Sequence, residues 1–165
     1  MIQVDMDGVI ADLKTAYIKK FGEKYWKDRK LQEEAILQLK NTDFFNTLKP
    51  FNTSFKLIEF VKKISNGNWG INSSPLRGDK YNCSYWKRVW LQRYGFMPEI
   101  KNLIFTSQKN KYAISNNKPN ILIDDMSSNI KMWEEKGGIG IHYRAEKHDL
   151  ENYLFAEIEK YYENI

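Results

Sequence analysis

The chain has 165 residues, of which 42% are hydrophobic, and its formal net charge is +5 at pH 7. This length suits one domain with a hydrophobic core and a small extra lobe, and the composition excludes a disordered chain. No apolar run approaches the roughly 18 residues that a membrane helix needs. Asp5 also interrupts the place where a secretory signal carries its apolar stretch. We therefore expect a soluble, cytoplasmic protein without a membrane partner.

The cysteine content and the charge suggest two further expectations. Cys83 is the single cysteine, so no internal disulfide can form, which suits a reducing compartment. The positive net charge favours a phosphate-bearing partner, although lysines scattered over a solvated surface explain the same value.

Short apolar runs alternate with segments of helical periodicity along the chain. The runs predict buried strands at Ile2–Val4, Trp69–Ile71, Leu103–Phe105, Ile121–Ile123 and Ile139–Ile141. Apolar residues at helical spacing predict helices within residues 55–64, 86–94, 130–133 and 150–161. Gly95 and Gly137 stand where helix C-caps belong, and Asp149 where an N-cap belongs. This alternation predicts an α/β domain with a mostly parallel sheet and a binding site beyond the carboxyl ends of the strands.

The region from residue 13 to residue 51 interrupts this alternation. It is rich in lysine, glutamate and aromatic residues, contains the helix-like run "KLQEEAILQLK", and has no convincing strand. We expect a small helical cap at 13–51, inserted after the first strand of a core domain formed by 1–12 and 52–165. Such an insertion can act as a lid over the strand ends, and the alternative is a surface helix pair that binds nothing.

The opening segment "MIQVDMDGVIAD" places two acidic residues directly after the first predicted strand. Residues two apart in an extended chain project to the same side, so Asp5 and Asp7 can address one point, and Gly8 lets the chain turn away. Two such carboxylates repel unless a cation lies between them, and Mg²⁺ suits them. Ala16 stands where an EF-hand has its closing glutamate, which excludes that loop. The alternative is a turn whose acids cap the next helix.

Three other predicted strands also end in polar residues. "ILIDD" supplies Asp124 and Asp125, "INSSP" supplies Ser73 and Ser74, and Lys109 follows "LIFTSQ". Each has a structural explanation when taken singly, as a turn hydroxyl, a solvated lysine or a helix cap. Together they place acids, hydroxyls and one lysine at the same edge of the predicted sheet.

The order of these residues resembles the haloacid dehalogenase-like phosphohydrolase superfamily, whose motifs are D-x-D, a Ser or Thr, a Lys and an acid pair. "DMDGVIAD", "INSSP", "SQKNKYA", "ILIDD" and "NIKMWEEKGGIGI" look like its 5'(3')-deoxyribonucleotidase branch. The resemblance implies a three-layer Rossmann-like core with a small helical cap. It also implies Mg²⁺-dependent removal of phosphate from (deoxy)nucleoside monophosphates.

The resemblance assigns the chemistry to the four acids. It implies that Asp5 attacks phosphorus to form an aspartyl-phosphate. Asp7 would protonate the leaving oxygen and later activate water, while its backbone carbonyl binds the metal. Mg²⁺ would be held by Asp5, Asp7 and the pair Asp124 and Asp125, with Asp125 as the direct ligand.

The resemblance further implies that Ser73 and Lys109 bind the phosphoryl oxygens, with Ser74 and Arg77 as additional contacts. Ser73 stands where this branch more often has threonine, and the hydroxyl is retained. Because the segment that follows Lys109 is longer than in some relatives, Lys111 remains an alternative to Lys109.

The cap is the part least similar to the family. Tyr25, Trp26, Phe44 and Phe45 are the aromatic residues that we place against a nucleobase, because stacking tolerates any base. The alternative is that these side chains form the core of the lobe.

The segment "YWKRVWLQRYG" mixes aromatic residues with Lys87, Arg88 and Arg93, as nucleic-acid surfaces do. We favour an amphipathic helix that buries Trp86 and Trp90 and exposes its charges.

Three functions are therefore compared. The first is a nucleotidase with a small-molecule nucleotide substrate. The second is a polynucleotide 3'-phosphatase, which needs an open cleft. The third is a non-catalytic basic nucleic-acid-binding protein on the same scaffold, against which the retention of Asp5, Asp7, Lys109 and Asp125 argues. Nucleic acid is thus the less favoured partner, and the sequence carries no signal for an oligomeric state.

Overall fold

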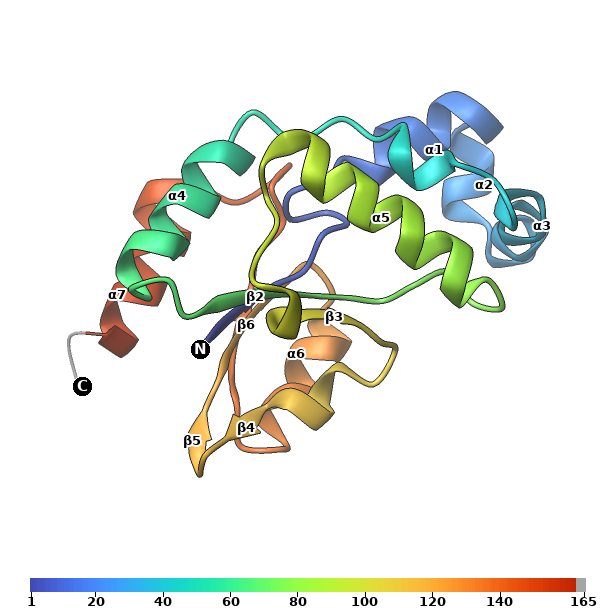
Figure 1. Ribbon diagram of the computed structural model, residues 1–165. Helices are drawn as coiled ribbons and strands as arrows, with labels where there is room; N and C mark the ends of the chain where they lie inside the picture. The colour runs from blue at the N-terminus through green and yellow to red at the C-terminus, as the bar shows by residue number, and fades with distance from the viewer. Residues whose placement is uncertain (163–165) are drawn as a thin grey trace.

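The computed structural model describes residues 1–162, which form a parallel sheet between layers of helices (Figure 1). The strands are β1 (Ile2–Val4), β2 (Trp69–Ser73), β3 (Leu103–Phe105), β6 (Ile121–Asp124) and β7 (Ile139–His142). Their order is β3-β2-β1-β6-β7, and every neighbouring pair is parallel. The predicted α/β class is confirmed. The chain proceeds from β1 to one edge and returns to fill the other, so the carboxyl ends of β1 and its neighbours mark the topological switch point.

The strands begin where the apolar runs begin, and three of them extend past those runs. β1 and β3 have the predicted bounds, whereas β2 continues to Ser73, β6 to Asp124 and β7 to His142. β1, β2 and β6 are buried at every position because helices cover both faces of the sheet. The residues added to these three strands end in Ser73, Asp124 and His142, which are polar. The hydrogen bonds of the sheet therefore hold polar side chains at its carboxyl edge, where a ligand can bind.

Helices cover both faces of the sheet. In Figure 1, α4 (Ser54–Ile64) and α5 (Lys80–Tyr94) lie above the sheet, α7 (Ala156–Tyr162) lies at the left next to α4, and α6 (Ser127–Glu134) lies below the sheet. The predicted caps at Asp149 and Gly95 are present: Asp149 accepts hydrogen bonds from two backbone N–H groups, and Gly95 is left-handed. The segment after Asp149 starts as the π-helical turn η4 (Leu150–Phe155). Within residues 1–162, no helix is long and apolar enough to cross a membrane.

Between β1 and α4 the chain forms a helical lobe. Its elements are α1 (Leu13–Phe21), α2 (Glu23–Lys27), α3 (Arg29–Leu39) and the 3-10 turn η1 (Phe44–Asn46). The two connections to the core run side by side, because Ala11 bridges Pro50 and the N–H of Asp12 donates to the carbonyl of Lys49 at 2.8 Å. Apolar side chains of the lobe join the buried cluster that contains β1. The division into a cap at 13–51 and a core stays a prediction.

A small hairpin was not expected from the sequence. β4 (Ile114–Ser115) and β5 (Lys118–Pro119) pair antiparallel between Lys109 and the acid pair. Asn116 and Asn117 join them with φ values of 50° and 60°. Asparagine tolerates this conformation better than most residues and supports a two-residue hairpin turn. The Asn-Asn dipeptide was the sequence feature that could have indicated this turn. The hairpin accounts for the extra length of the segment between Lys109 and the acid pair.

Candidate active site

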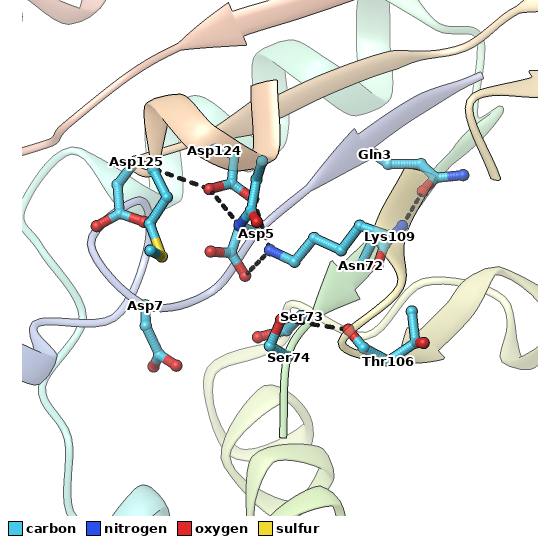
Figure 2. Close-up of polar contacts among 12 residues, drawn as sticks. Gln3, Asp5, Asp7, Asn72, Ser73, Ser74, Thr106, Lys109, Asp124 and Asp125 are labelled. Carbon is cyan, nitrogen blue, oxygen red and sulfur yellow. Dashed lines mark hydrogen bonds and ion pairs between the residues drawn. The ribbon is translucent and has the colours of Figure 1, made fainter. Parts of the chain in front are cut away.

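Three carboxylates meet at the carboxyl ends of β1 and β6. Asp5 follows β1, Asp124 ends β6, and Asp125 follows it; one oxygen from each lies within 4.8 Å of the others (Figure 2). Parallel pairing creates this meeting point, since Val4 is in register with Ile123 and the N–H of Asp5 donates to the carbonyl of Ile123 at 2.9 Å. Acids that are 119 or more positions apart in the sequence therefore share one site.

Lys109 is the cation at this cluster. It begins the 3-10 turn η3 (Lys109–Tyr112), and its Nζ lies 2.9 Å from Asp5 Oδ1 and 2.6 Å from Asp124 Oδ2. Its side chain is only 4% exposed, whereas Lys111 is exposed. Burial lowers the pKa of Lys109, but the charges of Asp5 and Asp124 outweigh burial and raise it. Of the two candidate lysines, the structure brings Lys109 to the acids.

The two acids of "ILIDD" have different surroundings. Asp124 is fully buried and accepts hydrogen bonds from Lys109, from the N–H of Met126 at 2.9 Å and from Asn129 Nδ2 at 3.1 Å. The carboxylate of Asp125 accepts no hydrogen bond from residues 1–162, while its backbone carbonyl lies 2.8 Å from His142 Nε2. Asp124 is held as part of the framework, and Asp125 keeps its oxygens available for a ligand.

The electrostatics of the cluster fit a divalent cation. Burial, followed by the charge of Asp5, raises the pKa of Asp124 to about 6. Burial, followed by the charges of Asp5 and Asp124, raises the pKa of Asp125 to about 7. Lys109 balances only one of the three clustered negative charges, so a further positive charge would stabilise the ionised acids. Clustered carboxylate oxygens are the donors that Mg²⁺ prefers, and the residues present therefore fit that ion.

Gly8 allows the first loop to pass directly over Asp125. Its φ is +78°, and a Cβ atom at this position would lie 2.3 Å from Asp125 Oδ2. The backbone carbonyl of Gly8 also accepts a hydrogen bond from the N–H of Ala145 at 3.0 Å. A side chain here would face both an unfavourable backbone conformation and a clash with the site.

Asp7 lies apart from the three clustered acids (Figure 2). Its Oδ2 instead accepts a hydrogen bond from Lys87 Nζ at 2.6 Å. Burial raises the pKa of Asp7, and the positive charge of Lys87 opposes that rise. The two aspartates of the D-x-D motif therefore have different neighbours. Asp5 belongs to the acidic cluster, and the Asp7 side chain lies beside a second lysine, Lys87.

Lys87 is the residue that the sequence interpretation missed, because its charge was expected to be exposed. That expectation is wrong: Lys87 is fully buried on the sheet-facing side of α5. It lies four residues after Cys83 and three before Trp90, both buried on the same helical face. The spacing of Lys87 from Cys83 and Trp90 was the sequence feature that could have predicted its burial. Trp86 is only half-buried, because it lies to the side of that face.

The hydroxyl residues occupy the end of β2. Ser73 is fully buried, and its Oγ accepts a hydrogen bond from Lys87 Nζ at 2.9 Å. Ser74 Oγ donates to the backbone carbonyl of Thr106 at 3.2 Å, next to the end of β3 (Figure 2). Both serines therefore lie at the edge where the acids meet.

Arg77 does not reach this edge. Its side chain is 77% exposed, and its nearest acidic partner is Glu33 of α3 at 4.0 Å. The chain turns outward after Pro75 and reverses at Gly78, where φ is +76°. This turn directs Arg77 toward Glu33 of the helical lobe, and its role as a phosphate contact stays a prediction.

Two cavities adjoin the site beneath the helical lobe. One of about 50 Å³ is lined by Asp7, Gly8, Asp125 and Trp26, among others. A second, of about 220 Å³, is lined mostly by apolar residues, including Trp26 and Phe45, together with Gln32. Trp26 and Leu13 line both cavities.

The other two aromatic residues of the lobe are placed differently. Tyr25 lines neither cavity and packs against Phe21 at 5.8 Å between ring centroids. Phe44 is 6% exposed and borders a separate cavity of about 600 Å³ behind α1. Phe44 and Phe45 are each 6% exposed and belong to the buried core cluster, and Tyr25 and Trp26 pack against that cluster. Base stacking by these four residues stays a prediction.

The fold is similar to that of solved hydrolases of the haloacid dehalogenase superfamily, and the order of these residues resembles the motifs of that superfamily. Among solved structures, a HAD-superfamily hydrolase from Ehrlichia chaffeensis matches with a TM-score of 0.55 at 13% identity, over 98% of this chain and 94% of its own. A HAD hydrolase of family IA, variant 3, from Entamoeba histolytica matches with a TM-score of 0.50 at 15% identity, over 96% and 98%. These similarities establish the fold.

The sequence is also similar to two curated nucleotidases. The chain is 28% identical to the mitochondrial 5'(3')-deoxyribonucleotidase of Mus musculus over 146 residues, which cover 75% of this chain and 63% of the mouse protein. The human mitochondrial 5'(3')-deoxyribonucleotidase is 27% identical, with 75% and 61% covered. The chain thus spans less than two thirds of these relatives. No family model matches the sequence.

Proposed function

We propose that this protein is a Mg²⁺-dependent phosphatase that removes phosphate from (deoxy)nucleoside monophosphates through an aspartyl-phosphate at Asp5. The observation that carries the proposal is the position of Asp5, which lies between the Lys109 ammonium at 2.9 Å and the acidic cluster with Asp125. The similarity to 5'(3')-deoxyribonucleotidases supports the substrate class.

The first half-reaction uses two aspartates. The Asp5 carboxylate attacks phosphorus and forms a new O–P bond while the bond from phosphorus to the leaving oxygen breaks. The leaving oxygen takes its proton from Asp7. Burial raises the pKa of Asp7, which favours the protonated form that this step requires. The product alcohol then departs and Asp5 carries the phosphoryl group.

The second half-reaction returns both aspartates to their starting forms. Asp7, now ionised, takes a proton from water as the water oxygen attacks phosphorus, and the O–P bond to Asp5 breaks. Lys109 and Ser73 bind the phosphoryl oxygens in both steps. Asp5, Asp125 and the backbone carbonyl of Asp7 would hold Mg²⁺, with Asp124 beside it, and the bound ion would supply positive charge that offsets the charge of the phosphate.

The surroundings of Asp5 favour a small substrate. Asp5 is 5% exposed, and the small cavity lined by its neighbours Asp7 and Asp125 is also lined by Trp26 of the lobe. An oligonucleotide end would need an open cleft, so this arrangement favours a mononucleotide over a 3'-phosphorylated strand. Trp26 and Phe45 supply aromatic surface for a base in the adjoining cavity.

Phosphate release tests the proposal. The purified protein is incubated with deoxy- and ribonucleoside 5'- and 3'-monophosphates, with and without Mg²⁺, and Asp5→Asn is the matched control. We expect Mg²⁺-dependent release that Asp5→Asn abolishes. Equal inertness of the wild type and Asp5→Asn across the panel would contradict the proposal. Steeply salt-dependent DNA binding without turnover would then favour the non-catalytic alternative.

A further inference from the structure

Lys87 is a fully buried cation that contacts three oxygen atoms. Its Nζ lies 2.6 Å from Asp7 Oδ2, 2.9 Å from Ser73 Oγ and 2.8 Å from the carbonyl oxygen of Ser74. Lysine is rarely buried completely unless it is paired, because removal of its charge from water is costly. These three contacts use all three N–H donors of the ammonium group. The position of the Lys87 ammonium is therefore well determined.

An aromatic side chain of the helical lobe packs over the ammonium group of Lys87. The ring centroid of Phe45, in η1, lies 5.0 Å from Lys87 Nζ. A cation over an aromatic face is attracted to it, and the ring also excludes water from the ammonium. The Lys87 ammonium is thus enclosed by β2, α5 and the segment that returns from the lobe, whereas Asp7, 20% exposed, lines the small cavity.

The ion pair occupies only one oxygen of Asp7. Oδ2 accepts the hydrogen bond from Lys87, whereas Oδ1 is buried and has no hydrogen-bond partner among residues 1–162. A buried oxygen without a partner is costly, and each such atom in a native structure calls for an explanation, such as a catalytic role, a bound water or an ion. Here the free oxygen belongs to the residue that would exchange a proton with the substrate.

We propose that Lys87 is a positioning residue for proton transfer by Asp7. It binds Oδ2 at the end of β2 and leaves Oδ1 as the oxygen that carries the transferred proton. In the first half-reaction the Oδ1–H bond breaks, its proton passes to the leaving oxygen, and that oxygen keeps the electron pair of the broken bond to phosphorus. This inference rests on the proposed phosphatase function and adds a residue to it.

The dependence on the leaving group separates this role from a purely structural one. An alkoxide such as the sugar oxygen needs a proton to depart, whereas p-nitrophenolate departs without one. kcat/KM reports the steps up to phosphoryl transfer for either ester. Loss of the Lys87 contact should therefore slow the nucleotide far more than p-nitrophenyl phosphate.

The experiment compares Lys87→Met with the wild type on a deoxynucleoside monophosphate and on p-nitrophenyl phosphate. We expect kcat/KM for the nucleotide to fall about 100-fold or more, and kcat/KM for p-nitrophenyl phosphate to fall by less than about 10-fold. Arg88→Met, which removes the exposed neighbouring charge, should change neither. Equal losses for both esters in Lys87→Met would overturn the positioning role.

A double variant covers the case in which Lys87→Met does not fold, because that change leaves Asp7 buried without its cation. Asp7→Asn combined with Lys87→Met removes both charges. If Lys87 acts through Asp7, this double variant should match Asp7→Asn on the nucleotide within about threefold. A further loss of about tenfold or more would show a separate role and overturn the inference. Absence of turnover of both esters by the wild type would instead overturn the proposed function.

Discussion

The ammonium group of Lys109 lies 2.6 Å from the carboxylate of Asp124, and both side chains are buried. The same ammonium contacts Asp5, so one cation bridges the ends of β1 and β6. Removing it would leave neighbouring buried carboxylates without their partner, which is more costly than the loss of an exposed ion pair.

Lys109→Met should reduce both turnover and stability. We expect kcat/KM to fall about 100-fold or more, because a donor to the phosphoryl oxygens is lost. The free energy of unfolding should fall by about 3–5 kcal/mol, as for other broken buried pairs. Lys111→Met is the matched control, because Lys111 is exposed two residues away. If Lys111→Met lost as much activity as Lys109→Met, the assignment of Lys109 would be wrong.

Gly8→Ala should disrupt the acidic cluster. The substitution combines a left-handed backbone with a Cβ atom 2.3 Å from Asp125 Oδ2, so Asp125 must move. We expect loss of Mg²⁺-dependent turnover and a drop in unfolding free energy greater than the roughly 1–2 kcal/mol of left-handed strain. Gly67→Ala has a similar φ of +79° with no atom within 4 Å, so it isolates the strain. Denaturant unfolding and phosphate release distinguish the two variants.

The acidic cluster predicts a pH dependence of stability in the absence of metal. The pKa of Asp125 rises from 3.8 in the unfolded chain to about 7 in the folded protein, chiefly through burial. Between these values the folded state binds more protons, so this group lowers stability as pH rises from about 4 to about 7. Asp124 acts in the same direction up to about pH 6. Thermal unfolding in a chelator should show this trend, and Asp125→Asn should reduce it.

Mg²⁺ should counteract that trend. A cation binds the ionised acids, so its stabilising effect should be larger above about pH 7 than below about pH 6, where Asp125 is protonated. The measurement is the increase in melting temperature on adding Mg²⁺ at each pH. An increase that does not depend on pH, or that persists in Asp125→Asn, would place the ion elsewhere.

Trp26→Ala should weaken nucleotide binding. Trp26 lines both cavities beside the site, and loss of base stacking costs about 1–3 kcal/mol, or about a 5- to 150-fold rise in KM. A phosphate ester that lacks a base should keep its kcat/KM. Tyr25→Ala is the control, because Tyr25 lines neither cavity. Similar KM changes in both variants would argue against stacking on Trp26.

The sheet could be predicted from local pattern because buried strands are uniformly apolar. β1 and β3 have the predicted bounds, and Asp149 caps the segment after β7 as expected. The ends of β2 and β6 were less predictable. Ser73 and Asp124 are polar, and only pairing with neighbouring strands keeps them in the sheet.

The environment of charged side chains could not be predicted in the same way. Lys87 and Arg77 are both cations near the "INSSP" motif, yet one is fully buried and the other is 77% exposed. Burial of Lys87 becomes favourable only because Asp7, in the loop after β1, and Ser73 and Ser74, at the end of β2, supply oxygens. Arg77 lies after an outward turn of the chain, where its side chain is exposed and the acidic residue beside it is Glu33 at 4.0 Å.

The sequence by itself determined the α/β class, the strand positions and the set of acids, hydroxyls and lysine at the strand ends, because apolar periodicity and motif order are local properties. Tertiary structure decided which of them meet. Parallel register brings Asp5 to Asp124 and Asp125, and packing of α5 turns Lys87 toward Asp7. Contacts between distant segments depend on how helices and strands pack, and desolvation makes a buried charge favourable only where that packing supplies its partner.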